Sequence, residues 1–143
     1  MIKLGIIGHS LNIISQLQKA VHQHDIILCG YFSENINNTE QNYGTLPEYK
    51  SKEKLIADSD AIIIASDKSE YYNTAVAALK NARHLFLPIT LLNTVSEANK
   101  LIKLANEANI ILKAFRPEAF FADHFRDFGH RIHIDRFVPV VYL

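Results

Sequence analysis

Residues 1–21 read MIKLGIIGHSLNIISQLQKAV, and this stretch decides the fold. Its first half is an apolar run of strand length, formed by Ile2, Leu4, Ile6 and Ile7. After a break at Gly8, apolar residues recur at helical spacing at Leu11, Ile14, Leu17 and Val21. A strand that enters a helix through a glycine-containing turn directs backbone N–H groups and the positive helix end at one point, where many α/β proteins hold a phosphate.

The turn after this strand is therefore the first candidate cofactor site, and its residues are Gly8, His9, Ser10 and Leu11. The dinucleotide fingerprint G-x-G-x-x-G would also need glycine at Ser10 and at Ile13. Ser10 puts a side chain where a pyrophosphate would approach the backbone, and Ile13 puts a branched one where helix and strand should pack closely. We expect weak anion binding to survive these changes better than dinucleotide binding.

Strand and helix patterns then alternate through nearly the whole chain. Apolar runs predict strands over residues 26–32, 61–65, 84–87 and 110–115, and helical patterns cover 52–57, 70–81 and the segment that Thr94 and Glu97 open as a capping box. This alternation predicts an α/β fold, a doubly wound, mostly parallel Rossmann-like sheet with helices on both faces. We expect a single domain over residues 1–129 and a C-terminal strand over 130–143.

The composition of the chain disfavours several classes of partner. The chain has 143 residues, and its 15 basic and 15 acidic residues give no net charge, which disfavours nucleic acid as a partner. Its apolar runs are of strand length and its start does not resemble a signal peptide, so we expect no membrane partner and a cytoplasmic location. The single cysteine, Cys29, lies in an apolar strand pattern and is expected to act as a small hydrophobic residue.

A metal site is not expected. Histidines and aspartates gather between residues 123 and 135, and His133 and Asp135 would share one face of a strand. No H-x-x-x-H pattern or cysteine pair accompanies them. Polar residues exposed on an edge strand explain the same pattern. From Pro117 the sequence predicts an aromatic-rich helix that ends at Gly129, and the aromatic residues of 115–128 are expected to form core or interface.

Four phrases together resemble the amino-terminal domain of the glucose-fructose oxidoreductase and inositol dehydrogenase family (Gfo/Idh/MocA). They are KLGIIGHS at 3–10, YGTLPEYKSKEKLIADSDAIIIAS at 43–66, YYNTAVAALKNARHLFL at 71–87 and TLLNTVSEANKLIKLANEANIIL at 90–112. The resemblance covers about residues 2–128. It implies a domain of the kind that binds NAD or NADP in enzymes acting on sugars and polyols, with a second α/β domain supplying much of the substrate site.

Several working residues of that family are replaced here. The acidic residue that closes the second strand and holds the ribose is matched by Phe32 or Ser33, with Glu34 the nearest carboxylate, and the family histidine is matched by Tyr71. The family's E-K-P signature reads Pro88, Ile89, Thr90, and its lysine helps to position cofactor and substrate. The resemblance adds Ser33, Ser66 and Tyr71 to the candidate cofactor-binding residues.

These replacements predict a degenerate, non-catalytic relative, a binding or structural module with no catalytic residue and no confident cofactor, although NAD or NADP is possible. One alternative is an NAD(P)-dependent oxidoreductase whose substrate domain is a separate subunit, because residues 130–143 resemble only the first strand of the family's second domain. Another is an adenylate or sugar-phosphate sensor. We expect a homodimer through this C-terminal strand, whose apolar side chains and unpaired amides need cover.

Overall fold

The computed structural model describes residues 2–8, 17, 26–33, 46–65 and 71–115. Several expectations fall on other residues and lie outside this described part. They are most of the helix after Gly8, the turn at residues 66–69, the aromatic helix from Pro117, the histidine cluster and the C-terminal strand.

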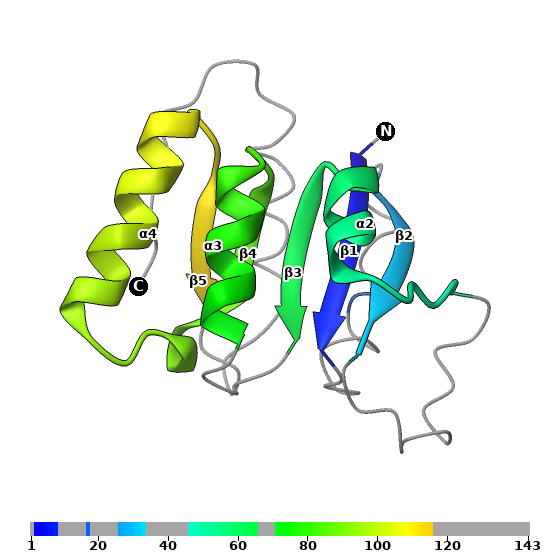
Figure 1. Cartoon of the computed structure of the whole chain (residues 1–143), viewed down its shortest axis with the longest axis horizontal. Coiled ribbons are helices and arrows are strands. Elements are labelled where there is room, and N and C mark those ends of the chain that lie inside the picture. Colours follow the sequence, from blue (N-terminus) through cyan, green and yellow to red (C-terminus); the bar gives the residue numbers. More distant parts are fainter. Residues whose placement is uncertain (1, 9–16, 18–25, 34–45, 66–70, 116–143) are drawn as a thin grey trace.

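Five parallel strands form one sheet in the order β2-β1-β3-β4-β5 (Figure 1). They are β1 (Ile2–Gly8), β2 (Ile26–Phe32), β3 (Ala61–Ala65), β4 (His84–Pro88) and β5 (Leu112–Phe115). Every pairing is parallel, which confirms the predicted α/β Rossmann-like sheet. The last strand begins two residues later than the sequence pattern predicted, because Ile110 and Ile111 only lead into it.

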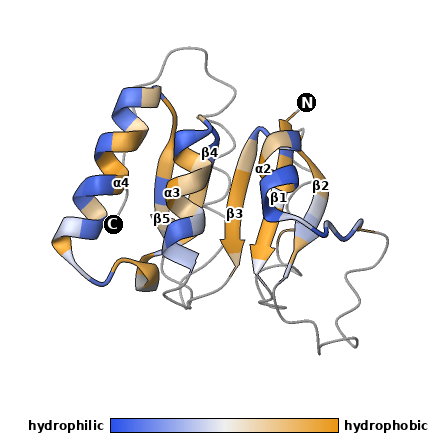
Figure 2. Cartoon of the chain, in the orientation of Figure 1, coloured by the Kyte–Doolittle hydropathy of each residue, from blue (hydrophilic) through white to orange (hydrophobic). Residues whose placement is uncertain are grey.

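Apolar side chains cover both faces of the sheet, as buried parallel strands require. On one face, Leu4, Ile6, Ile63 and Phe86 pack with Leu17, a buried helical residue that supports the predicted helix after β1. On the other face a larger cluster packs beneath α2 (Lys52–Asp58), α3 (Tyr72–Lys80) and α4 (Val95–Ala108). Figure 2 shows β1 and β3 as strongly hydrophobic strands, while α4 alternates between polar and apolar residues.

Side-chain caps fix the start of two helices. The Ser51 hydroxyl accepts a hydrogen bond from the Lys54 N–H at 3.3 Å and opens α2. The Thr94 hydroxyl accepts from the Glu97 N–H at 3.1 Å and opens α4, while the Glu97 carboxylate accepts from the Asn93 N–H, one residue earlier than a capping box expects. Both predicted helix starts are confirmed.

The helix α4 ends at Asn109, which takes the left-handed conformation with φ 56°. None of the helices in the described residues is both long enough and apolar enough to cross a membrane.

Candidate functional site

The carboxyl edge of the sheet contains the point where the strand order reverses. From β1 the chain moves outward to β2 and then crosses to the other side of β1 to form β3. Gly8 and Ala65 are paired at the ends of β1 and β3. Ligands of open α/β sheets bind in the crevice outside such strand ends, so this edge is the expected ligand site.

Gly8 closes β1 with φ 118°, a backbone conformation that residues with a side chain rarely adopt. The glycine is therefore required for the chain to leave the strand as it does. Among the other predicted residues, His9, Ser10, Leu11 and Ser66 lie outside the described part, so their placement at this turn stays a prediction.

Ser33 lies at the same edge as Gly8. Phe32 is paired with Ile7, one residue before Gly8, and Ser33 directly follows it. The Phe32 side chain packs against the buried cluster beneath α2, α3 and α4. The end of β2 thus presents an aromatic residue and a serine in place of the carboxylate that would hold a ribose.

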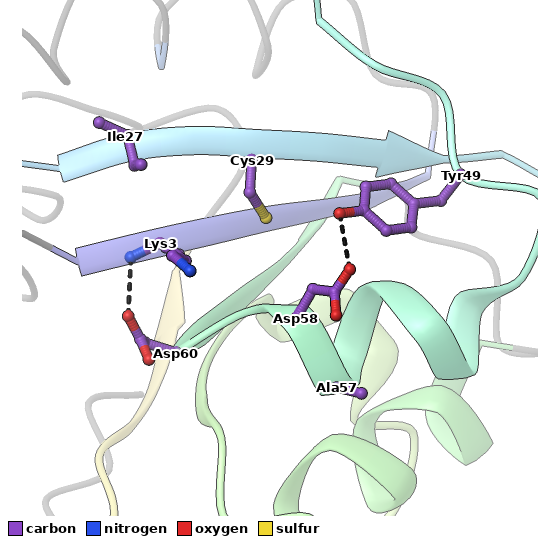
Figure 3. A pocket seen from close by; sticks show the side chains of 7 residues that line it. All are labelled: Lys3, Ile27, Cys29, Tyr49, Ala57, Asp58 and Asp60. Carbon is purple, nitrogen blue, oxygen red and sulfur yellow. Dashed lines mark hydrogen bonds between the residues drawn. The ribbon is translucent and has the colours of Figure 1, made fainter.

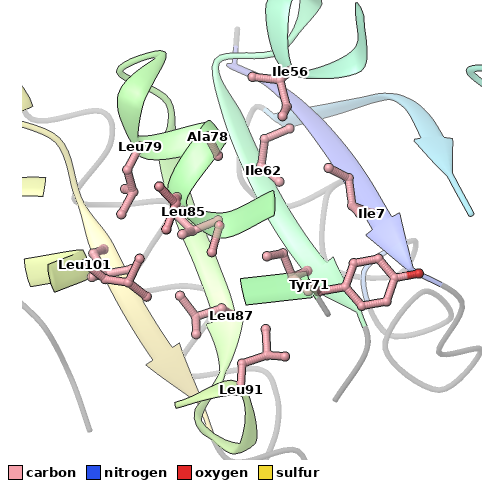
Figure 4. Close-up of a cluster of buried hydrophobic side chains, with 14 of the residues drawn as sticks. Ile7, Ile56, Ile62, Tyr71, Ala78, Leu79, Leu85, Leu87, Leu91 and Leu101 are labelled. Atoms are coloured by element: carbon pink, nitrogen blue, oxygen red, sulfur yellow. The ribbon is translucent and has the colours of Figure 1, made fainter. Parts of the chain in front are cut away.

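Tyr71 forms the N-cap position of α3 at this edge, but its ring belongs to the core. The residue is only 2% exposed and packs in the cluster that contains Ile7 and Leu87 (Figure 4). In that view the hydroxyl points toward the carboxyl end of β1. Gly8, Ser33 and Tyr71 therefore lie at one edge of the sheet, although Tyr71 contributes mainly to packing.

The end of β4 carries no ionisable side chain. Pro88 is the last residue of the strand, and the short 3-10 helix η3 (Ile89–Leu91) follows it. Leu91 is fully buried, and Ile89 is half-buried. Among the residues that the structure describes, the end of β4 thus places an isoleucine, Ile89, where the family resemblance implies a lysine.

A pocket of about 430 Å³ opens at the opposite, amino-terminal edge of the sheet (Figure 3). We name it the amino-edge pocket, and its lining residues are Lys3, Ile27, Cys29, Tyr49, Ala57, Asp58 and Asp60. The strands β1 and β2, the end of α2, and two residues outside them, Tyr49 and Asp60, contribute to it, so it depends on the tertiary fold. Ile27 is 39% exposed, which is unusual among the large apolar residues that the structure describes.

Two hydrogen bonds fix the carboxylates of the amino-edge pocket. The Tyr49 hydroxyl donates to Asp58 Oδ2 at 3.0 Å, and the Lys3 backbone N–H donates to Asp60 Oδ2 at 2.9 Å. The bond to Asp58 raises the pKa of the Tyr49 hydroxyl, because loss of its proton would leave two negative charges in contact. Tyr49 is thus a neutral donor.

Two glycines let the walls of this pocket approach each other. A Cβ on Gly5 would lie 2.5 Å from Ser59 Oγ and 2.9 Å from Leu55 Cδ1, so only glycine lets α2 pack this closely on β1. A Cβ on Gly30 would collide with the Tyr49 ring. Glycine is needed at both positions because neighbouring atoms approach the backbone too closely for a Cβ.

Cys29 is a neutral thiol at the floor of the amino-edge pocket. Its Sγ lies 3.1 Å from Ser59 Oγ, and that hydroxyl donates its proton to the Leu55 carbonyl at 2.6 Å. The thiol must therefore donate to Ser59, and burial raises the pKa of Cys29. Because the thiolate is the reactive form, the expectation that Cys29 behaves as a small hydrophobic residue agrees with this geometry.

His84 ties the start of β4 to the chain that leads into β5. Its Nδ1 accepts a hydrogen bond from the Ile111 N–H at 3.0 Å, so that nitrogen carries no proton. Burial lowers the pKa of His84, and the nearby Asp60 carboxylate opposes this effect only in part. Within the described residues no three histidine, cysteine or acidic side chains are placed to hold a metal ion.

Sequence reasoning missed the amino-edge pocket. Lys3 near the start of β1, Asp58 at the end of α2 and Asp60 just before β3 are ordinary polar residues at the ends of elements, and the chain shows no motif there. They converge because Leu4 pairs with Ala61, which brings the starts of β1 and β3 together. The charged residues at the start of β1 and just before β3 were the one available signal.

Comparison with known proteins agrees with this architecture. A family model described as "Oxidoreductase family, NAD-binding Rossmann fold" matches residues 2–115. A sequence search of curated proteins gave no significant match.

Several solved dehydrogenase structures share the fold. A UDP-N-acetylglucosamine 3-dehydrogenase from Acidithiobacillus ferrooxidans superposes with a TM-score of 0.68 at 23% identity, over 79% of this chain and 37% of that one. A dehydrogenase from Clostridium difficile gives 0.67 at 25% identity, over 79% and 38%. A biliverdin reductase from Synechocystis, solved with biliverdin and NADP+, gives 0.67 at 23% identity, over 79% and 37%. The chain thus spans well under half the length of these neighbours.

Proposed function

This chain belongs to the Gfo/Idh/MocA oxidoreductase family of NAD-binding Rossmann domains, and from that premise we propose that it is a binding or structural module that transfers no hydride by itself. The proposal concerns the chemistry of the carboxyl edge, where relatives would place the cofactor and substrate.

The proposal rests on the residues that follow β4, which carry no charge. The family resemblance implies a lysine at Ile89, where it would help to position the cofactor and substrate for hydride transfer. The isoleucine side chain can neither donate a proton nor form a charged hydrogen bond. Its immediate neighbours, Pro88 and Thr90, carry no charge that could replace it.

The end of β2 supports the same proposal independently. Ribose recognition in NAD-binding Rossmann domains uses an acidic residue at this place. Here Phe32 packs into the buried cluster beneath α2, α3 and α4, and Ser33 follows it in the sequence. A serine hydroxyl is a weaker partner for two ribose hydroxyls than a carboxylate is, because charge-assisted hydrogen bonds are stronger.

An alternative is an NAD(P)-dependent oxidoreductase that acts on a sugar or polyol, with the substrate domain supplied by another chain. The structural neighbours favour it, since one of them is a sugar-nucleotide dehydrogenase and another was solved with NADP+. The present chain matches only 37% of the length of each. The two candidates differ in whether the carboxyl edge retains a nicotinamide cofactor.

The test is a turnover assay on the purified chain. NAD+ or NADP+ is supplied with a panel of sugars, polyols and UDP-N-acetylglucosamine, and the absorbance of the reduced nicotinamide is followed. We expect no cofactor-dependent turnover from the natural chain or from an Ile89→Lys variant, because the ribose acid is missing as well. Turnover by the natural chain would contradict the proposal. A dinucleotide released from the denatured protein and identified by mass spectrometry would favour the alternative.

A further inference from the structure

We propose that the amino-edge pocket binds a small zwitterion, an α-amino acid with an apolar side chain. The pocket lies at the edge of the sheet opposite the expected nucleotide site, so the inference does not depend on the proposed function. Its volume of about 430 Å³ lies within the range of small-molecule sites and is ample for a ligand of this size.

The charged groups of the pocket come in both signs. Lys3 of β1 provides an ammonium, and Asp58 at the end of α2 and Asp60 just before β3 provide carboxylates (Figure 3). A ligand with only a carboxylate would meet two like charges, and a ligand with only an ammonium would meet that of Lys3. A molecule that carries both groups can pair its carboxylate with Lys3 and its ammonium with the aspartates.

Lys3, Asp58 and Asp60 each have a polar side-chain atom that can bind a ligand. The hydrogen bond between Lys3 and Asp60 uses the backbone N–H, so it does not engage the side-chain ammonium. The bonds from Tyr49 and Lys3 both end on Oδ2, so they leave Oδ1 of Asp58 and Asp60 to accept from another donor. The same bonds hold the two carboxylates in fixed orientations, which lowers the entropy lost on binding.

The remaining lining is apolar or neutral. Ile27 and Ala57 contribute aliphatic surface, and the Tyr49 ring lies against the backbone of Gly30. Cys29, whose pKa is raised by burial, adds an uncharged thiol at the floor. An apolar side chain can bury against this surface while the charged end of the amino acid stays at the opening.

Amide chemical shifts measured by NMR during titration test both the binding and its location. The probes are L-leucine and L-phenylalanine. Two analogues of leucine serve as controls: isopentylamine, which lacks the carboxylate, and 4-methylpentanoate, which lacks the ammonium. We expect saturable shifts at Lys3, Ile27, Cys29 and Asp60 with a dissociation constant below about 1 mM for at least one amino acid. Each of these analogues should bind at least about tenfold more weakly than leucine, which corresponds to about 1.4 kcal/mol of binding free energy.

Matched variants assign the effect to the pocket. Lys3→Gln and Asp60→Asn should each weaken binding at least about tenfold, and the new amide oxygen at residue 60 can still accept from the Lys3 N–H. Ala57→Phe should block binding by filling the pocket without a change of charge. Lys100→Gln and Glu107→Gln remove exposed charges of α4 and should leave the affinity unchanged.

Two results would overturn the inference. One is the absence of saturable shifts with both amino acids up to about 10 mM, ten times the expected constant. The other is binding of isopentylamine or 4-methylpentanoate as tightly as leucine, which would mean that the pocket does not recognise a zwitterion. Neither result bears on hydride transfer, so failure here remains distinct from failure of the proposed function.

Discussion

At the scale of the residue, Gly5 shows how one missing side chain permits the packing of a helix. Its Cβ would lie 2.5 Å from Ser59 Oγ and 2.9 Å from Leu55 Cδ1, both on well-buried neighbours. Replacing glycine by alanine usually gains about 0.4–1 kcal/mol through the unfolded state. Overpacking in a buried site costs about 1–3 kcal/mol, so the clash should outweigh that gain.

We therefore predict that Gly5→Ala lowers the free energy of unfolding by about 1–2 kcal/mol. Urea denaturation followed by circular dichroism measures this change. A double variant with Ser59→Ala removes the nearest atom and should recover part of the loss. Equal or greater stability of Gly5→Ala alone would show that α2 does not pack on β1 as closely as described.

His84 predicts how stability depends on pH. Burial lowers the pKa of His84 in the folded chain, whereas the unfolded chain protonates it near the usual value of about 6.5. Below that pH the unfolded state binds more protons, so stability falls as the pH decreases toward the folded pKa. Protonation would also remove the acceptor for the Ile111 N–H.

An asparagine at this position provides the test, since its side-chain oxygen can accept from the Ile111 N–H but does not titrate. We expect the free energy of unfolding of His84→Asn to fall less than that of the natural chain between about pH 6.5 and pH 5. The other titratable groups are common to both proteins and cancel in the difference. Identical pH profiles would contradict the assignment of a lowered pKa to His84.

At the scale of the element, the cap of α4 is the clearest case in which a sequence pattern specifies a structure. Thr94 accepts from the Glu97 N–H at 3.1 Å, and this satisfies one of the helix's free donors. Thr94→Ala should cost about 1 kcal/mol of stability, and Thr94→Ser should retain most of it. Thermal unfolding of the three proteins measures the difference. Equal melting temperatures for the alanine and serine variants would contradict a role for the hydroxyl.

The elements themselves could be predicted because the strands are short apolar runs, the helices have a helical period, and α2 and α4 also have a side-chain cap. The run at β3 has no polar residue inside it, and β1 has only Lys3, at its exposed start, as expected for strands covered on both faces. The bounds of α3 were less predictable. The sequence pattern covers 70–81, whereas α3 runs over Tyr72–Lys80 and its N-cap residue Tyr71 makes no side-chain capping hydrogen bond.

Features that depend on register between distant strands could not be predicted. The pairing of β1 with β2 shifts between Leu4 and Gly5, which leaves Cys29 as an extra residue on β2 facing the amino-edge pocket. Likewise, nothing in the sequence shows that Tyr71 is buried. At the carboxyl edge, by contrast, the position of Gly8 at the end of β1 followed from the sequence because one strand and one turn determine it.

At the scale of the whole molecule, we propose that the chain forms a homodimer through residues 130–143 and the aromatic helix predicted before them. The support is the sequence, since Ile132, Ile134 and Val138 would expose apolar surface on a lone strand. A two-fold axis pairs such a strand with its own copy and closes the assembly. The segment lies outside the described residues.

Light scattering tests this assembly on the intact chain and on a chain truncated after Gly129. The intact chain should have twice its 16.2 kDa monomer mass, and the truncated chain should be monomeric. Circular dichroism of the truncated chain verifies that it remains folded. An intact chain of monomer mass, or a folded truncated chain that stays dimeric, would rule out this interface.

We propose that the carboxyl edge no longer supports nicotinamide chemistry, and a calorimetric titration of NAD+ and NADP+ tests this most directly. For the natural chain we predict dissociation constants weaker than about 1 mM with both nucleotides. Ser10→Gly combined with Ile13→Gly should gain at most weak affinity and no turnover, because the ribose carboxylate and the lysine are missing independently of the glycines. Submillimolar binding of either nucleotide by the natural chain would contradict the account.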